Sequence, residues 1–212
     1  MVDQHLIDIM KKLQAESKQR KFLESVELAV NLKDIDLTNP KNRLQEEIIL
    51  PNGRGKQIRV GIFGSSEMAV KAKGIADVIV QPEELEALAS DKSKAKKFAG
   101  TADYYLAEAP LMPTIGKRLG VVLAPRGKMP KPIPPGSDPK AAIEKLRSSV
   151  TARTRDRKTF HLPIGTKDMP AEKLAENLDA VLKRLMIKLE RGKQNIQSAY
   201  VKTTMGPSFR VM

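Results

Sequence analysis

The sequence of 212 residues contains no cysteine and no tryptophan. Without thiols the chain can form no disulfide, no thiolate nucleophile and no cysteine-ligated metal site. Three Tyr and five Phe are its whole aromatic content, which leaves few rings on which unpaired bases could stack. If the protein binds nucleic acid, we therefore expect it to recognise shape and backbone more than stacked bases.

Long apolar runs are also missing. None reaches the roughly 18–20 residues that a membrane-spanning helix needs. The first stretch, MVDQHLIDIMKKLQ, carries Asp3 and Asp8 and has no continuous apolar core, so it is unlike a secretory signal. We expect no membrane partner and a cytoplasmic location.

Enzyme motifs are scarce. The only histidines, His5 and His161, have no second histidine at metal-ligand spacing, so no metal or other cofactor is expected. The stretch GIFGSSEMAVKAKG, residues 61–74, reads as a strand, a small-residue turn and a helix, but it contains neither nucleotide-binding glycine motif. No catalytic residue is nominated. Two alternatives stay open: an α/β enzyme that acts on a phosphorylated substrate through residues 54–150, and a general DNA-binding protein.

Positive charge is abundant. Lys and Arg number 38 against 25 Asp and Glu, which gives a net charge of +13 and favours a polyanionic partner. Residues 1–53 carry a net charge of −1, whereas residues 54–150 and 151–212 each carry +7. Arg153, Arg155 and Arg157 alternate along an expected strand, so they would share one face. That face is either a row directed at phosphates or simply a solvated surface.

The order of elements predicts two domains. Between residues 54 and 150, strands alternate with helices, which is typical of an α/β layer around a parallel sheet. The flanks supply a few strands and two amphipathic helices, and neither has enough apolar surface to fold alone. We therefore expect a discontinuous α+β domain, 1–53 with 151–212, that carries an inserted α/β domain, 54–150.

One proline-rich stretch is unusual. LAPRGKMPKPIPPG, residues 123–136, contains five prolines and three basic residues, and it follows VVLAP (121–125), which we expect to be a strand. Proline fixes φ and removes amide donors, so this stretch is predicted to be a stiff, exposed loop. It is either a rigid connector or a preshaped basic finger for phosphate contact.

Three stretches together carry a family resemblance: RKFLESVEL (20–28), LAPRGKMPKP (123–132) and YVKTTMGPS (200–208). The chain resembles the family of large-subunit ribosomal protein one, from the mobile lateral stalk, over nearly its whole length. The run KMPKPIPP resembles the corresponding run in archaeal members of this family. The resemblance implies a two-layer α+β domain of split β-α-β type with an inserted, Rossmann-like three-layer α/β domain.

The resemblance also implies a function without catalysis. The expected partner is a folded junction of large-subunit ribosomal RNA near the tRNA exit site, where the stalk helps to release deacylated tRNA. Family members also repress translation of their own messenger RNA through a site that mimics the ribosomal one. Off the ribosome, the protein is expected to be a monomer.

Carried over position by position, the resemblance places RNA contacts in the discontinuous domain. The matching positions are Lys21, Phe22, Glu24, Ser25, His161, Ser198, Thr204, Met205, Gly206 and Pro207. Secondary basic contacts are expected from Arg126, Lys128, Lys131, Arg153 and Arg155.

The uncharged stretch TTMGPS, residues 203–208, fits a role in selectivity. Charged side chains attract every phosphate alike, so telling one folded RNA from another needs short, preorganised groups. Thr204 is expected to read the RNA with its hydroxyl, Gly206 to permit close approach, Pro207 to stiffen the turn, and Met205 to cover the contact. The alternative is that this stretch only forms the turn after the last strand.

Overall fold

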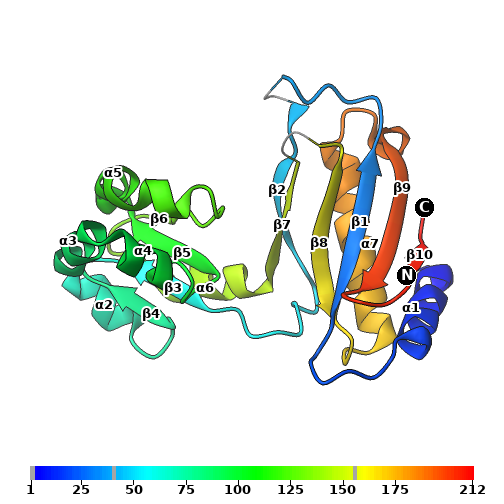
Figure 1. Ribbon diagram of the computed structural model, residues 1–212, viewed down its shortest axis with the longest axis horizontal. Coiled ribbons are helices and arrows are strands. Elements are labelled where there is room, and N and C mark those ends of the chain that lie inside the picture. Colours follow the sequence, from blue (N-terminus) through cyan, green and yellow to red (C-terminus); the bar gives the residue numbers. More distant parts are fainter. Residues whose placement is uncertain (1–2, 40–41, 155–156) are drawn as a thin grey trace. The chain divides into compact units, whose positions relative to one another are not determined.

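The computed structural model describes residues 3–39, 42–154 and 157–212 (Figure 1). The chain divides into two compact units: the two-segment unit, Met1–Lys56 with Ser148–Met212, and the central unit, Gln57–Arg147. Each junction lies three residues from the position expected from the sequence, at 56/57 and 147/148 in place of 53/54 and 150/151. The two units are described separately below.

The two-segment unit is built on a four-stranded antiparallel sheet in the order β10-β9-β1-β8. Its strands are β1 (Ser25–Leu32), β8 (Thr159–Thr166), β9 (Ile196–Thr203) and β10 (Ser208–Arg210). β8 and β9 both run antiparallel to β1, so they are parallel to each other, and helix α7 (Ala171–Lys188) lies between them in the sequence. A strand from the first chain segment therefore separates two strands of the second.

One face of this sheet holds the core. Alternate residues of β1 are buried, as its period-two pattern predicts: Val26, Leu28, Val30 and Leu32. They form one hydrophobic cluster with the apolar stripes of α7 and of α1 (Gln4–Glu16). Figure 1 shows α7 behind the sheet, and among the described residues no helix covers the opposite face.

A two-stranded ribbon and a buried amide complete this unit. β2 (Gln45–Ile49) pairs antiparallel with β7 (Ser149–Arg153). The fully buried side chain of Asn177, on α7, donates to the carbonyls of Gly53 (2.9 Å) and Ile164 (2.8 Å) and accepts from the amide of Asn52 (3.0 Å). Asn177 thus fastens the chain that leaves β2 to both α7 and β8.

The central unit has a four-stranded parallel sheet in the order β4-β3-β5-β6. Its strands are β3 (Val60–Phe63), β4 (Val78–Val80), β5 (Tyr104–Glu108) and β6 (Lys131–Ile133). Its helices are α2 (Ser66–Ala72), α3 (Pro82–Ser90), α4 (Lys92–Phe98), α5 (Met112–Leu123) and α6 (Pro139–Ser148). Short 3-10 turns occur at Ala109–Leu111 in this unit and at Gly192–Asn195 in the two-segment unit.

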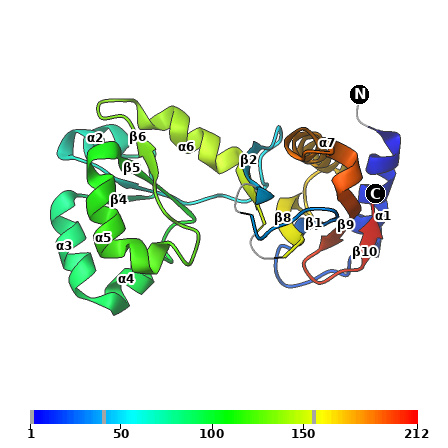
Figure 2. The ribbon, with the colours of Figure 1, turned by 90° about the horizontal axis from the view of Figure 1, so that it is seen from above.

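Both faces of the parallel sheet are covered by helices. Ile62 packs with Met68 of α2 and Ile143 of α6, whereas its neighbour Phe63 packs with Leu85 of α3 and Ile115 of α5. Successive strand residues point to opposite faces, so these two clusters lie on opposite sides of the sheet. Figure 2 shows the two groups of helices separated in this way. The chain is thus a mixed α/β protein with several sheets.

The expected strand at residues 121–125 is wrong. Helix α5 continues to Leu123, because Ile115, Leu119 and Leu123 recur at a spacing of four and are all buried. The fourth strand is instead β6, inside the stretch predicted to be a loop, where Lys131 pairs with Leu106. Pro132 is tolerated there because β6 is an edge strand, on which a missing amide leaves no neighbour unpaired.

We predict that Asn177→Ala lowers the free energy of unfolding by about 2–4 kcal/mol, because two carbonyls and one amide lose their partner in the interior. Chemical denaturation followed by circular dichroism measures this change. Lys173→Ala, an exposed change on the same helix, is the control and is expected to change stability by less than about 0.5 kcal/mol. Equal effects of the two substitutions would contradict the assigned role.

Candidate nucleic-acid interface

The stretch TTMGPS forms the turn between β9 and β10, and Thr204 fastens it to the start of β1. The amide of Thr204 donates to the carbonyl of Ser25 at 3.0 Å. Its hydroxyl accepts from the amide of Ser25 (3.2 Å) and lies 3.3 Å from the same carbonyl, to which it donates. A hydroxyl has one proton and two lone pairs, so a single acceptor position remains for any other partner.

The buried carboxylate of Glu24 holds the same turn by a hydrogen bond. Glu24 is only 2% exposed, and its Oε1 accepts from the amide of Met205 at 3.0 Å. Arg20 places Nε 3.6 Å from that oxygen and donates from its other end to the carbonyl of Met205 at 3.3 Å. We call this pair the Arg20–Glu24 clamp. It holds both polar backbone atoms of Met205, so Glu24 positions the turn and is not itself presented at the surface.

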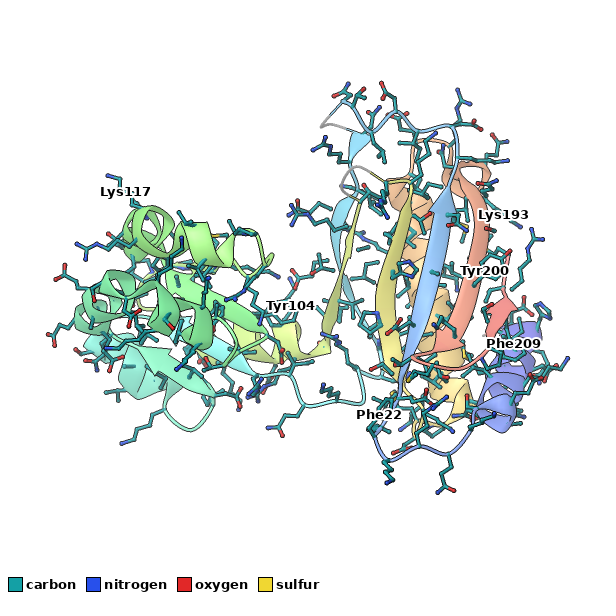
Figure 3. All side chains as sticks on the ribbon, in the orientation of Figure 1. Phe22, Tyr104, Lys117, Lys193, Tyr200 and Phe209 are labelled. Atoms are coloured by element: carbon teal, nitrogen blue, oxygen red, sulfur yellow. The ribbon has the colours of Figure 1, made fainter. Side chains whose placement is uncertain are left out.

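Apolar side chains remain exposed around this clamp. Phe22 is 51% exposed, Leu23 49% and Met205 59%, and Lys21 and Pro207 are exposed beside them. In Figure 3, Phe22 projects from the end of the unit at which β1 begins. The structure therefore brings the early segment, residues 21–25, next to the late one, residues 204–207. We call the exposed side chains of these two segments the turn surface.

A basic residue that the sequence did not nominate borders the turn surface. The Lys167 ammonium donates to the carbonyls of Ser17 (2.8 Å) and Lys18 (3.1 Å), and its amide donates to the carbonyl of Glu24 (3.0 Å). Lys167 thereby fixes the segment that leads into β1. It also lines an open cavity of about 530 Å³, together with residues 17, 19–24 and 168.

His161 and Ser198 lie elsewhere, on the open face of the sheet. His161 is exposed on β8 opposite Ala29, and Tyr200 of β9 lies opposite Ala29 on its other side. Four residues of strand separate Ala29 from Ser25, or about 13 Å at 3.3 Å per residue. Figure 3 shows Tyr200 on this face, which extends the turn surface along β1.

A chain of hydrogen bonds crosses three strands of that face. The Thr159 hydroxyl donates to Asn31 Oδ1 at 2.7 Å, and Asn31 Nδ2 donates to the Ser198 hydroxyl oxygen at 2.9 Å. Ser198 is buried and already has a protein partner. Ser198 was nominated by the family resemblance. Strand alternation from Ser198 could also have found Tyr200, whereas Asn31 and Lys167 needed the three-dimensional pairing. Arg20, next to Lys21, was missed because nothing in the sequence links it to residue 205.

Gly206 has a reason within the protein itself. A Cβ at this position would overlap the Thr203 hydroxyl oxygen, which lies 3.4 Å from the hydroxyl of Ser17. Thr203 is fully buried, so it can make room only by rotating away from Ser17. The expected reason for this glycine was close approach of RNA; the packing of the turn already requires it.

The three basic residues of the proline-rich stretch are turned onto their own unit. Arg126 donates to the carbonyl of Lys96 at 3.0 Å, and the Lys128 ammonium donates to the carbonyls of Ala99 (2.9 Å) and Ala102 (2.7 Å). The Lys131 ammonium lies 5.8 Å from the ring centroid of Tyr104, which Figure 3 labels. These contacts fold the basic stretch back onto its own unit.

The predicted row of arginines along one strand is wrong for the two members that the structure describes. β7 ends at Arg153, and Arg157 lies in a bend before β8 begins at Thr159. The two therefore do not alternate along one strand, although both are exposed. Arg155 lies outside the described residues.

The central unit offers no support for the enzyme alternative. In doubly wound sheets, phosphates bind beyond the carboxyl ends of the strands, at the start of a helix. At the end of β3 that place is taken by the protein's own carboxylate: Glu108 accepts from the Ser65 amide (2.9 Å) and hydroxyl (3.0 Å). Within the described ranges, no group of three or more His, Asp or Glu could hold a metal ion. Nor does that part of the chain contain a helix long and apolar enough to cross a membrane.

We predict that Glu24→Ala loosens the turn without unfolding the protein. The amide of Met205 loses a charged acceptor worth about 1–3 kcal/mol, so its hydrogen exchange should accelerate about 5- to 150-fold. Amide exchange by NMR measures this at Met205 and, as an internal standard, at Val30 in the middle of β1. Glu16→Ala, an exposed change on α1, is the control. Unaltered exchange at Met205 would rule out the clamp.

We predict that Gly206→Ala destabilises the free protein by about 1–3 kcal/mol, because the new methyl group displaces Thr203 from Ser17. In the background of Thr203→Ala the same substitution should have a smaller effect, since the obstructing hydroxyl is gone. Denaturation of the four proteins of this double-mutant cycle measures the coupling. An effect on RNA binding with none on stability would restore the RNA-approach explanation.

Comparison with known proteins gives the context of these residues. The profile of the Ribosomal protein L1p/L10e family matches residues 13–207. The large ribosomal subunit protein uL1 of Thermoplasma volcanium is 56% identical over 207 residues, which cover 96% of this chain and 95% of that protein. The protein of the same name from Methanocella arvoryzae is 53% identical over the full length of both chains. That from Archaeoglobus fulgidus is 52% identical over 92% of this chain and 91% of its own.

These relatives come from archaea, in agreement with the branch that the run KMPKPIPP indicates. The matched region contains the early segment, the turn and the whole central unit. The family consists of structural ribosomal proteins and not of enzymes. The chain therefore belongs to the Ribosomal protein L1p/L10e family.

Proposed function

We propose that this protein is a structural component of the large ribosomal subunit and that it binds ribosomal RNA through the turn surface. The family membership supports the ribosomal role. The observation that carries the site is the exposure of Phe22, Leu23 and Met205 on a turn that Thr204 and the Arg20–Glu24 clamp hold rigid. Preorganised groups lose little entropy on binding, so they favour selective recognition of one folded RNA.

The division of labour between the units is part of the proposal. The two-segment unit, a two-layer α+β domain of split β-α-β type, acts as the RNA-binding domain. The central unit, a Rossmann-like three-layer α/β domain, is its insertion and makes secondary contacts. A basic rim formed by Lys21 and Arg20 supplies sequence-independent attraction, while the apolar side chains and His161 read the shape of the junction.

The biological setting follows from the resemblance. We propose that the junction is that of the mobile lateral stalk near the tRNA exit site, and that the protein helps to release deacylated tRNA there. The same surface then also binds an rRNA-like site on the protein's own messenger RNA and represses its translation. The protein is accordingly ribosome-associated in the cytoplasm, and it is a monomer when free.

We predict that Phe22→Ala and Met205→Ala each weaken binding to the stalk-junction RNA about 5- to 150-fold, since burying a large apolar side chain against the RNA is worth about 1–3 kcal/mol. Filter binding at matched salt measures junction RNA, random RNA and duplex DNA side by side. Random RNA should bind almost as before, because its affinity comes from Lys and Arg.

Val121→Ala, an equally apolar and exposed change on α5 of the central unit, is the control and should leave all three affinities unaltered. Equal affinity of the unmodified protein for duplex DNA and junction RNA would favour a general DNA-binding protein instead. A loss of junction binding in the Val121→Ala variant alone would move the site to the central unit.

A further inference from the structure

Helix α4 of the central unit presents a dense group of cations. Four of its seven residues are lysines, Lys92, Lys94, Lys96 and Lys97, and all four are exposed. The apolar contact of the helix points inward through Ala95, which is buried. Arg126 adds a fifth cation, because its guanidinium donates to the carbonyl of Lys96 at 3.0 Å. We call these five residues the α4 lysine surface.

Cations outnumber acids in the central unit. Residues 57–147 contain 15 Lys and Arg against 10 Asp and Glu, a net charge of +5. The five cations of the α4 lysine surface equal that surplus, so the rest of the unit is neutral overall. One third of the cations of this unit thus lie on one short helix and its neighbour.

Three other cations of the central unit have a carboxylate partner, whereas in the described part of the chain these lysines do not. Lys71 pairs with Glu67 at 2.8 Å, Arg118 with Glu86 at 3.0 Å and Arg147 with Asp77 at 3.1 Å. Among the described residues, none of the four α4 lysines has a carboxylate partner. The nearest acid along the chain, Asp91, directs Oδ1 to the backbone amides of Ser93 (2.7 Å) and Lys94 (3.4 Å) as the helix cap.

The helix dipole favours a lysine at only two of these four positions. Lys96 and Lys97 occupy the last turn of α4, where the helix dipole favours cations. Lys92 and Lys94 occupy its first turn, where the dipole disfavours them, and Lys92 and Lys96 are like charges four residues apart. Among the described residues the Asp91 cap is the acid at this end of the helix, and no carboxylate pairs with the lysine ammonium groups, which favours an anionic partner outside the protein.

The chemistry of the surface selects the kind of partner. Lysine is depleted in protein–protein interfaces, whose centres use aromatic side chains and arginine. A membrane-binding helix would need an exposed apolar face, and here Ala95 is buried. A phosphate backbone needs only flexible point charges at intervals, and Lys92 to Lys97 span about 7.5 Å of helix. We propose that the α4 lysine surface binds the phosphate backbone of double-stranded RNA without sequence preference.

This site is separate from the proposed turn surface, since it lies in the other unit and needs neither Phe22 nor Met205. It is also separate from the proline-rich stretch, of which only Arg126 takes part. The expected signature is electrostatic: a steep dependence of affinity on salt and no dependence on sequence.

The test compares two charge-matched triple variants of the full chain. One carries Lys92→Gln, Lys94→Gln and Lys97→Gln on α4. The other carries Lys73→Gln, Lys140→Gln and Lys145→Gln, which are all exposed. Lys73 directly follows α2, and the other two lie on α6. These two helices cover the opposite face of the sheet. Circular dichroism and thermal melting establish that both variants are folded.

Fluorescence anisotropy with a short RNA duplex of arbitrary sequence then gives the slope of log affinity against log salt. The α4 variant should lose about 2 units of slope, or roughly 0.7–0.9 for each phosphate contact removed, and the control variant less than about 0.5. Equal losses in both variants would overturn the proposal, because net charge alone would then explain binding. The proposal would also be overturned if the α4 variant lost binding to phosphatidylserine vesicles, or to a poly-glutamate peptide, while its binding to duplex RNA stayed intact.

The affinities for junction RNA and random RNA, measured in the same experiment, test the proposed function separately from this inference. The α4 variant should retain the preference of the unmodified protein for the junction. If that preference is absent from the unmodified protein but the slope falls as expected, the turn-surface proposal fails and the α4 lysine surface stands.

Discussion

The two-segment unit depends on the pairing of β1 with both β8 and β9. β1 is an inner strand of the sheet and comes from the first chain segment, whereas both of its neighbours come from the second. Both strands that the structure describes in the first segment, β1 and β2, pair only with strands of the second, and the core residues of β1 need α7 to cover them. The central unit can be inserted between the segments because this pairing, and the Asn177 contacts beside it, hold them together.

The candidate interface is a consequence of the same pairing. Because β1 starts beside the end of β9, Ser25 meets Thr204 and Glu24 meets Met205, although about 180 residues separate them in the sequence. Three kinds of contact converge on the turn: the doubly bonded hydroxyl of Thr204, the Arg20–Glu24 clamp and the packing of Gly206 on Thr203. Residues that the resemblance nominated as RNA contacts thus divide into those that shape the turn and those that remain exposed.

Charge is arranged differently in the two units. At the turn surface, the cations border exposed apolar side chains, and Arg20 and Lys167 are also engaged with the backbone. On α4, the lysines have no carboxylate partners in the described part of the chain, and Ala95 of the same helix is buried. The two kinds of recognition need different surfaces. Selective recognition of shape needs fixed groups, whereas sequence-independent attraction of phosphate needs mobile charges.

Periodicity was enough to predict most elements. The alternation of Val26, Leu28, Val30 and Leu32 predicts β1, and the stripe of leucines from Leu174 to Leu185 predicts α7, because one buried face imposes a pattern on the residues that form it. Periodicity failed at residues 121–125, where Val121 and Val122 suggested a strand. In the structure, Leu123 instead continues the four-residue spacing of helix α5. Short runs of β-branched residues are ambiguous in this way until the neighbouring layers are known.

The sequence by itself determined the two groups of elements, the concentration of charge and the segments that carry the family resemblance, because these are properties of neighbouring residues. Only the tertiary structure decided what each nominated side chain does. Glu24 is drawn inside by the amide of Met205, Lys128 is bound by two carbonyls of its own unit, and Phe22 is left exposed. Hydrogen bonds between residues far apart in the chain depend on the register of strands and the packing of helices, and no local pattern of residues encodes them.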